Sequence, residues 1–205
     1  MENETNTQDL NDRLNLIENM ISEGRRKCES WGWTFVLWGV AYYVAMAWSS
    51  GIFPASVWSR QYLAWPVTMI AAGVVTSLVA SRIAHGQPQT TLGRAIGAVW
   101  SAMGISLFII LMGLGLGGRY ETQVFLAIIG GMLGAANLAS AIILKWKMQF
   151  ACAVVWLGAA VAGCFATESQ AGTAFLAATF FGQIVFGVYA MIRDARRRRQ
   201  VALHA

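Results

Sequence analysis

The chain has 205 residues, of which 57% are hydrophobic and 12% are charged, and its formal net charge is +5 at pH 7. An ordinary soluble domain has about 25% charged residues, so this composition excludes a conventional soluble fold and is typical of a protein embedded in lipid.

Residues 1–29 are predicted to form a cytoplasmic amphipathic helix ahead of the first apolar run. Its apolar or small residues follow alternating steps of four and three, the spacing of a coiled-coil seam. We expect this stripe to be covered first by the protein's own helix bundle or the lipid interface, and second by another copy of the chain. The stripe consists of Leu10, Leu14, Ile17, Ile21, Gly24 and Cys28.

Six runs without a charged residue follow, and each is long enough for a helix of about 20 residues that crosses the hydrocarbon core. The sequence therefore predicts an all-α integral membrane protein in which residues 30–192 form a six-helix bundle. A basic cytoplasmic tail follows at 193–205. The expected spans are 31–50, 61–84, 94–117, 122–145, 148–167 and 171–192.

The distribution of Lys and Arg predicts the orientation of these spans. Thirteen of the fifteen cations fall on one side of the six-span map, and only Arg60 and Arg119 fall on the other. By the positive-inside rule we expect a multi-pass protein of the cell membrane with both termini in the cytoplasm.

Clustered cations near both ends of the bundle domain predict contact with the anionic cytoplasmic leaflet. Nucleic acid is the disfavoured partner, because no helix-turn-helix, zinc-finger or RNP motif accompanies them. A homo-oligomer or another membrane protein stays open as a partner. The predicted lipid-anchoring cations are Arg25, Arg26, Lys27, Arg196, Arg197, Arg198 and Arg199.

The odd-numbered spans open alike, with LWGVA at 37–41, VWSAM at 99–103 and VWLGA at 155–159. The even-numbered spans at 62–77 and 125–140 also share several residues. Two interpretations stay open: three parallel two-helix repeats, or an echo of a composition rich in Ala, Gly, Leu and Val.

Small residues four apart predict close helix pairs, as expected where helices associate in lipid. Two other patterns resemble functional motifs but lack the features that those motifs require. The stretch GLGLGG at 113–118 matches a dinucleotide-binding fingerprint but lacks the preceding strand, and His85 and His204 lack partners at ligand spacing. We expect no catalytic residue, metal or cofactor. The spaced small residues are Gly93, Gly97 and Ser101, Gly130 and Gly134, Gly131 and Ala135, and Gly158 and Ala162.

None of the six runs contains an ionisable Asp, Glu, His, Lys or Arg, although such groups usually mark proton relays and ion pathways. Asn137 and Gln183 are the strongest polar groups, and we expect them at similar depth as interhelical contacts or, alternatively, substrate contacts. Aromatic rings attract cations and apolar solutes, so a set of Trp and Tyr residues in the spans is a candidate cavity lining. It consists of Trp38, Tyr42, Tyr43, Trp100, Trp156 and Tyr189.

Two functions follow from these observations. The first is a non-catalytic accessory, sensory or assembly component of the membrane, which the charge-free spans favour. The alternative is a small transporter, channel or solute-binding subunit for a neutral, apolar or cationic molecule, which an aromatic cavity would favour. A filled bundle favours the first and an open interior favours the second.

Overall fold

The computed structural model describes residues 2–51, 63–84, 91–119 and 121–203, and within these ranges every regular element is a helix. The all-α prediction is confirmed. In chain order the elements are α1 (Glu2–Ser30), α2 (Gly32–Ser49), α4 (Ala64–Ala84), α5 (Thr91–Leu116), α6 (Thr122–Leu144), α7 (Lys147–Phe165), α8 (Glu168–Thr179), the π-helix η2 (Phe180–Val185) and α9 (Phe186–Leu203).

Among the described residues, five helical segments are long and apolar enough to cross a membrane. They are α4, α5, α6, α7 and the continuous segment from α8 through η2 into α9. Helix α2 has 18 residues, among them three Trp and two Tyr, and it is not one of these five segments. A chain with this many membrane-length helices is a multi-pass membrane protein.

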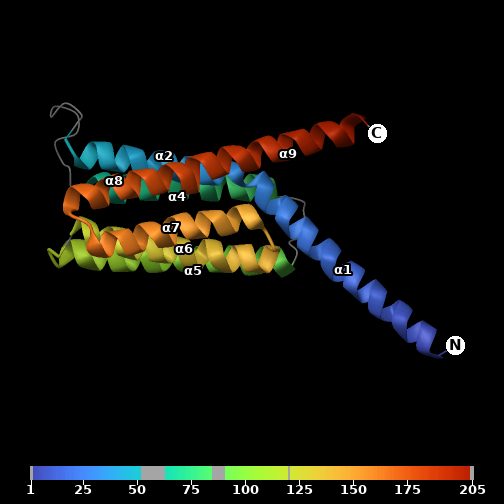
Figure 1. The fold of residues 1–205 in the computed structure, drawn as a ribbon. Helices are drawn as coiled ribbons and strands as arrows, with labels where there is room; N and C mark the ends of the chain where they lie inside the picture. Colours follow the sequence, from blue (N-terminus) through green and yellow to red (C-terminus); the bar gives the residue numbers. More distant parts are fainter. Residues whose placement is uncertain (1, 52–62, 85–90, 120, 204–205) are drawn as a thin grey trace.

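The helices form an elongated bundle with two layers: α2, α4 and the α8–α9 segment lie in one, and α5, α6 and α7 in the other (Figure 1). The two chain ends project from the same end of the bundle (Figure 1). We call this the terminal end. The turn from α6 to α7 also lies there, whereas the turns from α5 to α6 and from α7 to α8 lie at the opposite end (Figure 1).

Glycines set two of the closest helix contacts. A Cβ at Gly130 of α6 would lie 2.8 Å from the Trp156 carbonyl oxygen of α7, and one at Gly134 would lie 2.6 Å from the Leu157 side chain. Helices α2 and α9 cross at Gly32 and Gly187, where each glycine faces the carbonyl oxygen of the other. The contacts at Gly130 and Gly134 confirm the expectation of close packing at small residues, whereas the crossing at Gly32 and Gly187 was not predicted.

The same expectation is wrong at three other positions. A Cβ added at Gly97, Gly131 or Gly158 would have no neighbour within 4 Å. These glycines lie on helix faces that the bundle leaves open, and a spacing of four residues does not specify which face of a helix meets a neighbour.

Aromatic side chains fill the centre of the bundle. Phe175 of α8 lies 5.7 Å from Tyr42, 5.4 Å from Phe125 and 6.2 Å from Trp156, measured between ring centroids. Each distance is in the range at which aromatic pairs attract one another. A second buried cluster, which includes Leu144, Trp146 and Phe186, lies nearer the terminal end.

Helix α1 leaves the bundle at an angle (Figure 1). It ends at a turn on Trp31, whose carbonyl oxygen accepts hydrogen bonds from the backbone N–H and the hydroxyl of Thr34. Gly24 is the first buried residue among those of α1 whose burial the structure describes, and it packs against Leu92 of α5 and Leu144 of α6. The part of α1 before Gly24 projects from the bundle, and we call residues 2–23 the arm.

Some predicted features differ from the structure or lie outside it. The helix of the sixth span does not stop at 192 but continues through the basic tail to Leu203. The turn before it is fixed by a capping box, in which Thr167 and Gln170 exchange hydrogen bonds between side chain and backbone. Arg60, His85 and His204 lie outside the described residues, and so does the rest of segment 52–62.

We predict that Gly130→Ala lowers the free energy of unfolding by about 1 to 3 kcal/mol, because the new methyl group would overpack the contact with α7. Gly131→Ala is the matched control on the open face of the same turn and should leave stability unchanged or raise it slightly. Thermal unfolding of the purified protein in detergent measures both. Equal effects of the two substitutions would contradict the α6–α7 packing.

Candidate functional site

The aromatic residues that the sequence predicts as a cavity lining are distributed over the bundle, and several of them form hydrogen bonds with neighbouring helices. Trp38 of α2 donates its indole N–H to the Thr76 hydroxyl of α4 at 3.2 Å. Trp100 of α5 donates to the Ser140 hydroxyl of α6 at 3.1 Å. These bonds tie neighbouring helices together.

The two tyrosines of α2 behave differently from each other. Tyr42 is buried among the rings around Phe175. Tyr43 donates its hydroxyl to the Leu176 carbonyl oxygen of α8 at 2.8 Å. Tyr189 is more than one third exposed, and its hydroxyl accepts from Arg193 at 3.4 Å.

Asn137 and Gln183 are both buried, on α6 and η2 respectively, but they are not each other's partners. Asn137 Nδ2 donates to the Leu133 carbonyl oxygen of its own helix at 2.8 Å. Neither Asn137 Oδ1 nor Gln183 Oε1 accepts a hydrogen bond from the protein. A direct bond between the two side chains would need one of these oxygens.

Gln183 lies within the π-helical segment η2, which the sequence did not predict. The indole nitrogen of Trp156, on α7, faces this segment: a Cβ at Gly182 would lie 2.5 Å from it. That nitrogen and the Thr179 hydroxyl just before the segment are also buried without a protein partner. Single π-helical turns inside longer helices recur at functional positions, so this polar centre is one candidate site.

The second candidate site is a buried ion pair at the base of α1. Glu29 is fully buried, and its two carboxylate oxygens lie 3.2 Å from Arg193 Nε and 2.6 Å from Arg197 Nη2 on α9. Arg193 and Arg197 are one turn apart and so lie on the same face of α9. The three side chains join the first and last helices of the chain.

Arg25 adds a third helix to this junction. Its Nη2 donates to the carbonyl oxygens of Leu144 at 2.9 Å and Lys145 at 3.0 Å, and its Nε donates to Leu144 at 3.3 Å. Lys145 has a left-handed backbone conformation, with φ of 47°, that ends α6. Arg25 thus donates to carbonyl groups that the end of a helix leaves without partners. Its positive charge also interacts favourably with the negative end of the α6 dipole.

We call Glu29, Arg25, Arg193 and Arg197, with the end of α6, the joint. Sequence reasoning treated Arg25 and Arg197 as lipid-anchoring cations and did not single out Glu29. The sequence does contain a signal for this ion pair. Glu29 directly precedes the first uncharged run, and Arg193 directly follows the sixth. Opposite charges at the same membrane boundary are candidates for an ion pair.

The other predicted lipid-anchoring cations remain available at the terminal end. Arg26, Arg196 and Arg199 are exposed, and Arg198 lies 2.9 Å from Asp194 in an exposed pair along α9. The side chain of Lys27 lies outside the described part of the structure. Lipid contact of these residues stays a prediction.

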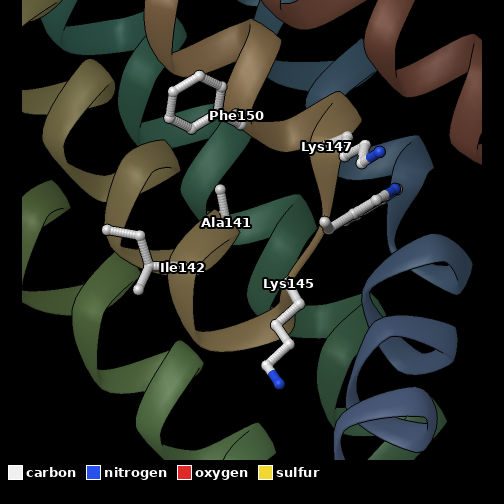
Figure 2. Close-up of a pocket in the computed structure, with 6 residues that line it drawn as sticks. Ala141, Ile142, Lys145, Lys147 and Phe150 are labelled. Atoms are coloured by element: carbon white, nitrogen blue, oxygen red, sulfur yellow. The ribbon is translucent and has the colours of Figure 1, made fainter.

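The two best-formed hollows in the described part of the chain are shallow and lie at the two ends of the bundle. One, of about 540 Å³, lies at the turn from α6 to α7, and the other, of about 520 Å³, at the turn from α5 to α6. Figure 2 shows that Lys145 and Lys147 extend from the first of these turns in different directions. They do not converge on one point, so this hollow does not form an anion clamp.

No family model matches the chain, and neither a characterised protein nor a solved structure matches it significantly. The function is therefore inferred from the residues of the joint and of the polar centre.

We predict that Glu29→Ala lowers the free energy of unfolding by about 2 to 3 kcal/mol, because it leaves two arginines at a buried position without their counter-charge. Arg198→Ala is the control: it removes an exposed pair within one helix, which contributes about 0.5 kcal/mol or less. Thermal unfolding in detergent compares the two. If Glu29→Ala costs no more than the control, the joint does not stabilise the fold.

Proposed function

We propose that the protein is a six-span, non-catalytic assembly component of the cell membrane, whose bundle holds the arm at the cytoplasmic face. The observation that carries this proposal is the joint. A buried carboxylate and two arginines fix the base of α1 to α9, while the arm itself projects beyond the bundle with its large apolar side chains exposed.

The packing of α2 supports the sixth span. It lies beside α4 and beside the continuous segment from α8 through η2 into α9 (Figure 1). Its Gly32 meets Gly187 of α9, and its Gly39 packs against Gln183 and Ile184 of η2. Five Trp and Tyr side chains lower its overall hydropathy, but most of these rings are buried or half-buried in the bundle. Only its outward face would meet lipid.

The positions of the charges support cytoplasmic termini. Arg25, Arg193 and Lys145 lie at the terminal end, whereas Arg119, Glu121 and Glu168 belong to turns at the opposite end. A cation-rich end faces the cytoplasm in most membrane proteins. This assignment would put the joint and the arm inside the cell. The three-repeat architecture stays a prediction.

The packed interior favours an anchor over a transporter. Of the aromatic rings proposed as a cavity lining, Trp38, Tyr43 and Trp100 donate to neighbouring helices. Tyr42 and Trp156 pack against Phe175. Two hollows in the described part of the chain open at the ends of the bundle. Transport of a small neutral solute is the second candidate. One observation favours it: polar atoms without a protein partner surround η2.

We predict that a membrane-impermeant maleimide applied to intact cells labels Arg119→Cys and does not label Asp12→Cys or Ala202→Cys. Each cysteine is introduced into a chain whose three native cysteines are replaced by Ala. Permeabilised cells provide the control, in which all three sites react. External labelling of position 12 or 202 would overturn the six-span orientation.

We also predict that Leu14→Asp with Ile17→Asp reduces the mass of the assembly that mild detergent extracts from membranes, because two charges would enter the apolar stripe of the arm. Native gels or mass photometry measure it. The control is Asn15→Asp with Asn19→Asp, which adds the same charge on other faces of the arm. An equal mass for both double variants would contradict an assembly role for the arm.

A further inference from the structure

We propose that the arm pairs with the arm of a second copy of this chain as a parallel two-stranded coiled coil. The proposal rests on the anchor-and-arm function above and names the partner. It is drawn from the exposure of one face of α1, the charges that flank that face, and the way in which the joint holds the helix.

The face in question is the coiled-coil seam, made of Leu10, Leu14, Ile17 and Ile21. Leu10, Leu14 and Ile17 are each more than half exposed, and Ile21 is half-buried. Gly24 is the next position of the same pattern, and there the stripe already packs against Leu92 and Leu144 of the bundle. The uncovered seam therefore ends where the bundle begins, which leaves four seam layers, just under two heptads, for a partner.

The charges beside the seam match a parallel pair. With Leu14 and Ile21 at a positions and Leu10 and Ile17 at d positions, Arg13 occupies a g position and Glu18 the following e position. In a parallel dimer a g residue lies beside the e residue five positions later on the other chain. Arg13 of each chain would thus meet Glu18 of the other, which gives two opposite-charge contacts.

The remaining flanking positions do not oppose this pairing. Met20 would lie beside Arg25 of the other chain, so no like charges face each other there. In an antiparallel alignment that keeps the same apolar layers, Arg13 would lie beside Met20 and Glu18 beside Asn11. Both ion pairs would be lost, so the charges select the parallel arrangement.

The joint favours the same direction. It holds the C-terminal end of each arm at the terminal end of its own bundle. Two copies in one membrane would then project their arms from the same face. Arms that both begin at this face run parallel when they meet.

The charge of the arm argues against the lipid surface as its cover. Residues 2–23 contain six carboxylates and a single arginine. An anionic leaflet repels such a segment, whereas the exposed cations that a leaflet attracts, such as Arg26 and Arg196, lie beyond the arm. The protein's own bundle covers little of the seam, because Leu10, Leu14 and Ile17 are more than half exposed and Ile21 alone among the four is half-buried.

A coil of this length is marginal for a free peptide. Confinement of both chains to one membrane raises their effective concentration and offsets part of the association entropy. The pair would be reversible.

Cysteine cross-linking in native membranes tests the proposal, using the full chain with its native cysteines replaced by Ala. Leu14→Cys puts a thiol in the seam, and Asp12→Cys puts one on the opposite face. A short bismaleimide should join two Leu14→Cys chains at least about fivefold faster than two Asp12→Cys chains, because only seam positions approach within a few ångströms of their equivalents.

Charge exchange supplies a second, independent readout. In the Leu14→Cys chain, Arg13→Glu or Glu18→Arg alone should lower the cross-linking rate by about twofold to fivefold, because like charges then face each other. The double variant should restore the rate to within about twofold, since both ion pairs re-form with reversed polarity.

Three outcomes would overturn the paired arm. One is equal cross-linking of Leu14→Cys and Asp12→Cys, and another is failure of the double variant to recover. The third is a Leu14→Cys adduct with a different protein and none with itself. The proposed function is tested separately, by the labelling of position 12 and by the mass of the Leu14→Asp, Ile17→Asp assembly. If those two results are as predicted and one of the three outcomes above occurs, the assembly role stands and only the identity of the partner is wrong.

Discussion

The buried carboxylate of Glu29 is the constraint on which the rest of the structure depends. A carboxylate without counter-charges would not stay buried at the edge of an apolar bundle, because the cost of desolvation is several kcal/mol. Arg193 and Arg197 meet it from α9, so the position of α9 and the base of α1 are fixed together. Arg25, one turn earlier on α1, extends the constraint to the end of α6. The joint therefore decides where the arm leaves the bundle.

Inside the bundle, packing replaces charge as the organising force. Lipid supplies no hydrophobic drive between helices, so close backbone approach and interhelical hydrogen bonds hold them together. Gly130 and Gly134 bring α6 against α7, and the indole groups of Trp38 and Trp100 bond to hydroxyls on the next helix. Large exposed side chains on α4 and α5, such as Leu78 and Ile109, form the faces that lipid would cover. A closely packed bundle of this kind can hold the base of the projecting helix α1 in a fixed position.

The polar centre around η2 is the exception to this packed interior. A π-helical turn redirects the residues of the last long helix, and it brings Gln183 and the Gly182 backbone toward α2 and Trp156. Several buried polar atoms there have no partner within the protein. Such groups cost stability, because each is buried without a hydrogen bond from the protein. The arm and the polar centre are thus separate features, one at the terminal end and the other inside the bundle.

The sequence alone determined the helical membrane class and most helix boundaries, because runs of uncharged residues and their length are one-dimensional properties. It also singled out Asn137 and Gln183 as the strongest polar groups of the spans, and it identified the apolar stripe of residues 10 to 28. Only the tertiary structure decided which glycines are contacts, because Gly130 and Gly131 have the same local sequence signal and differ in the face that α7 covers. It also decided the partners of Glu29 and Arg25. Those pairs join residues more than a hundred positions apart, and the spacing of charges along a chain does not specify which helix ends meet in space.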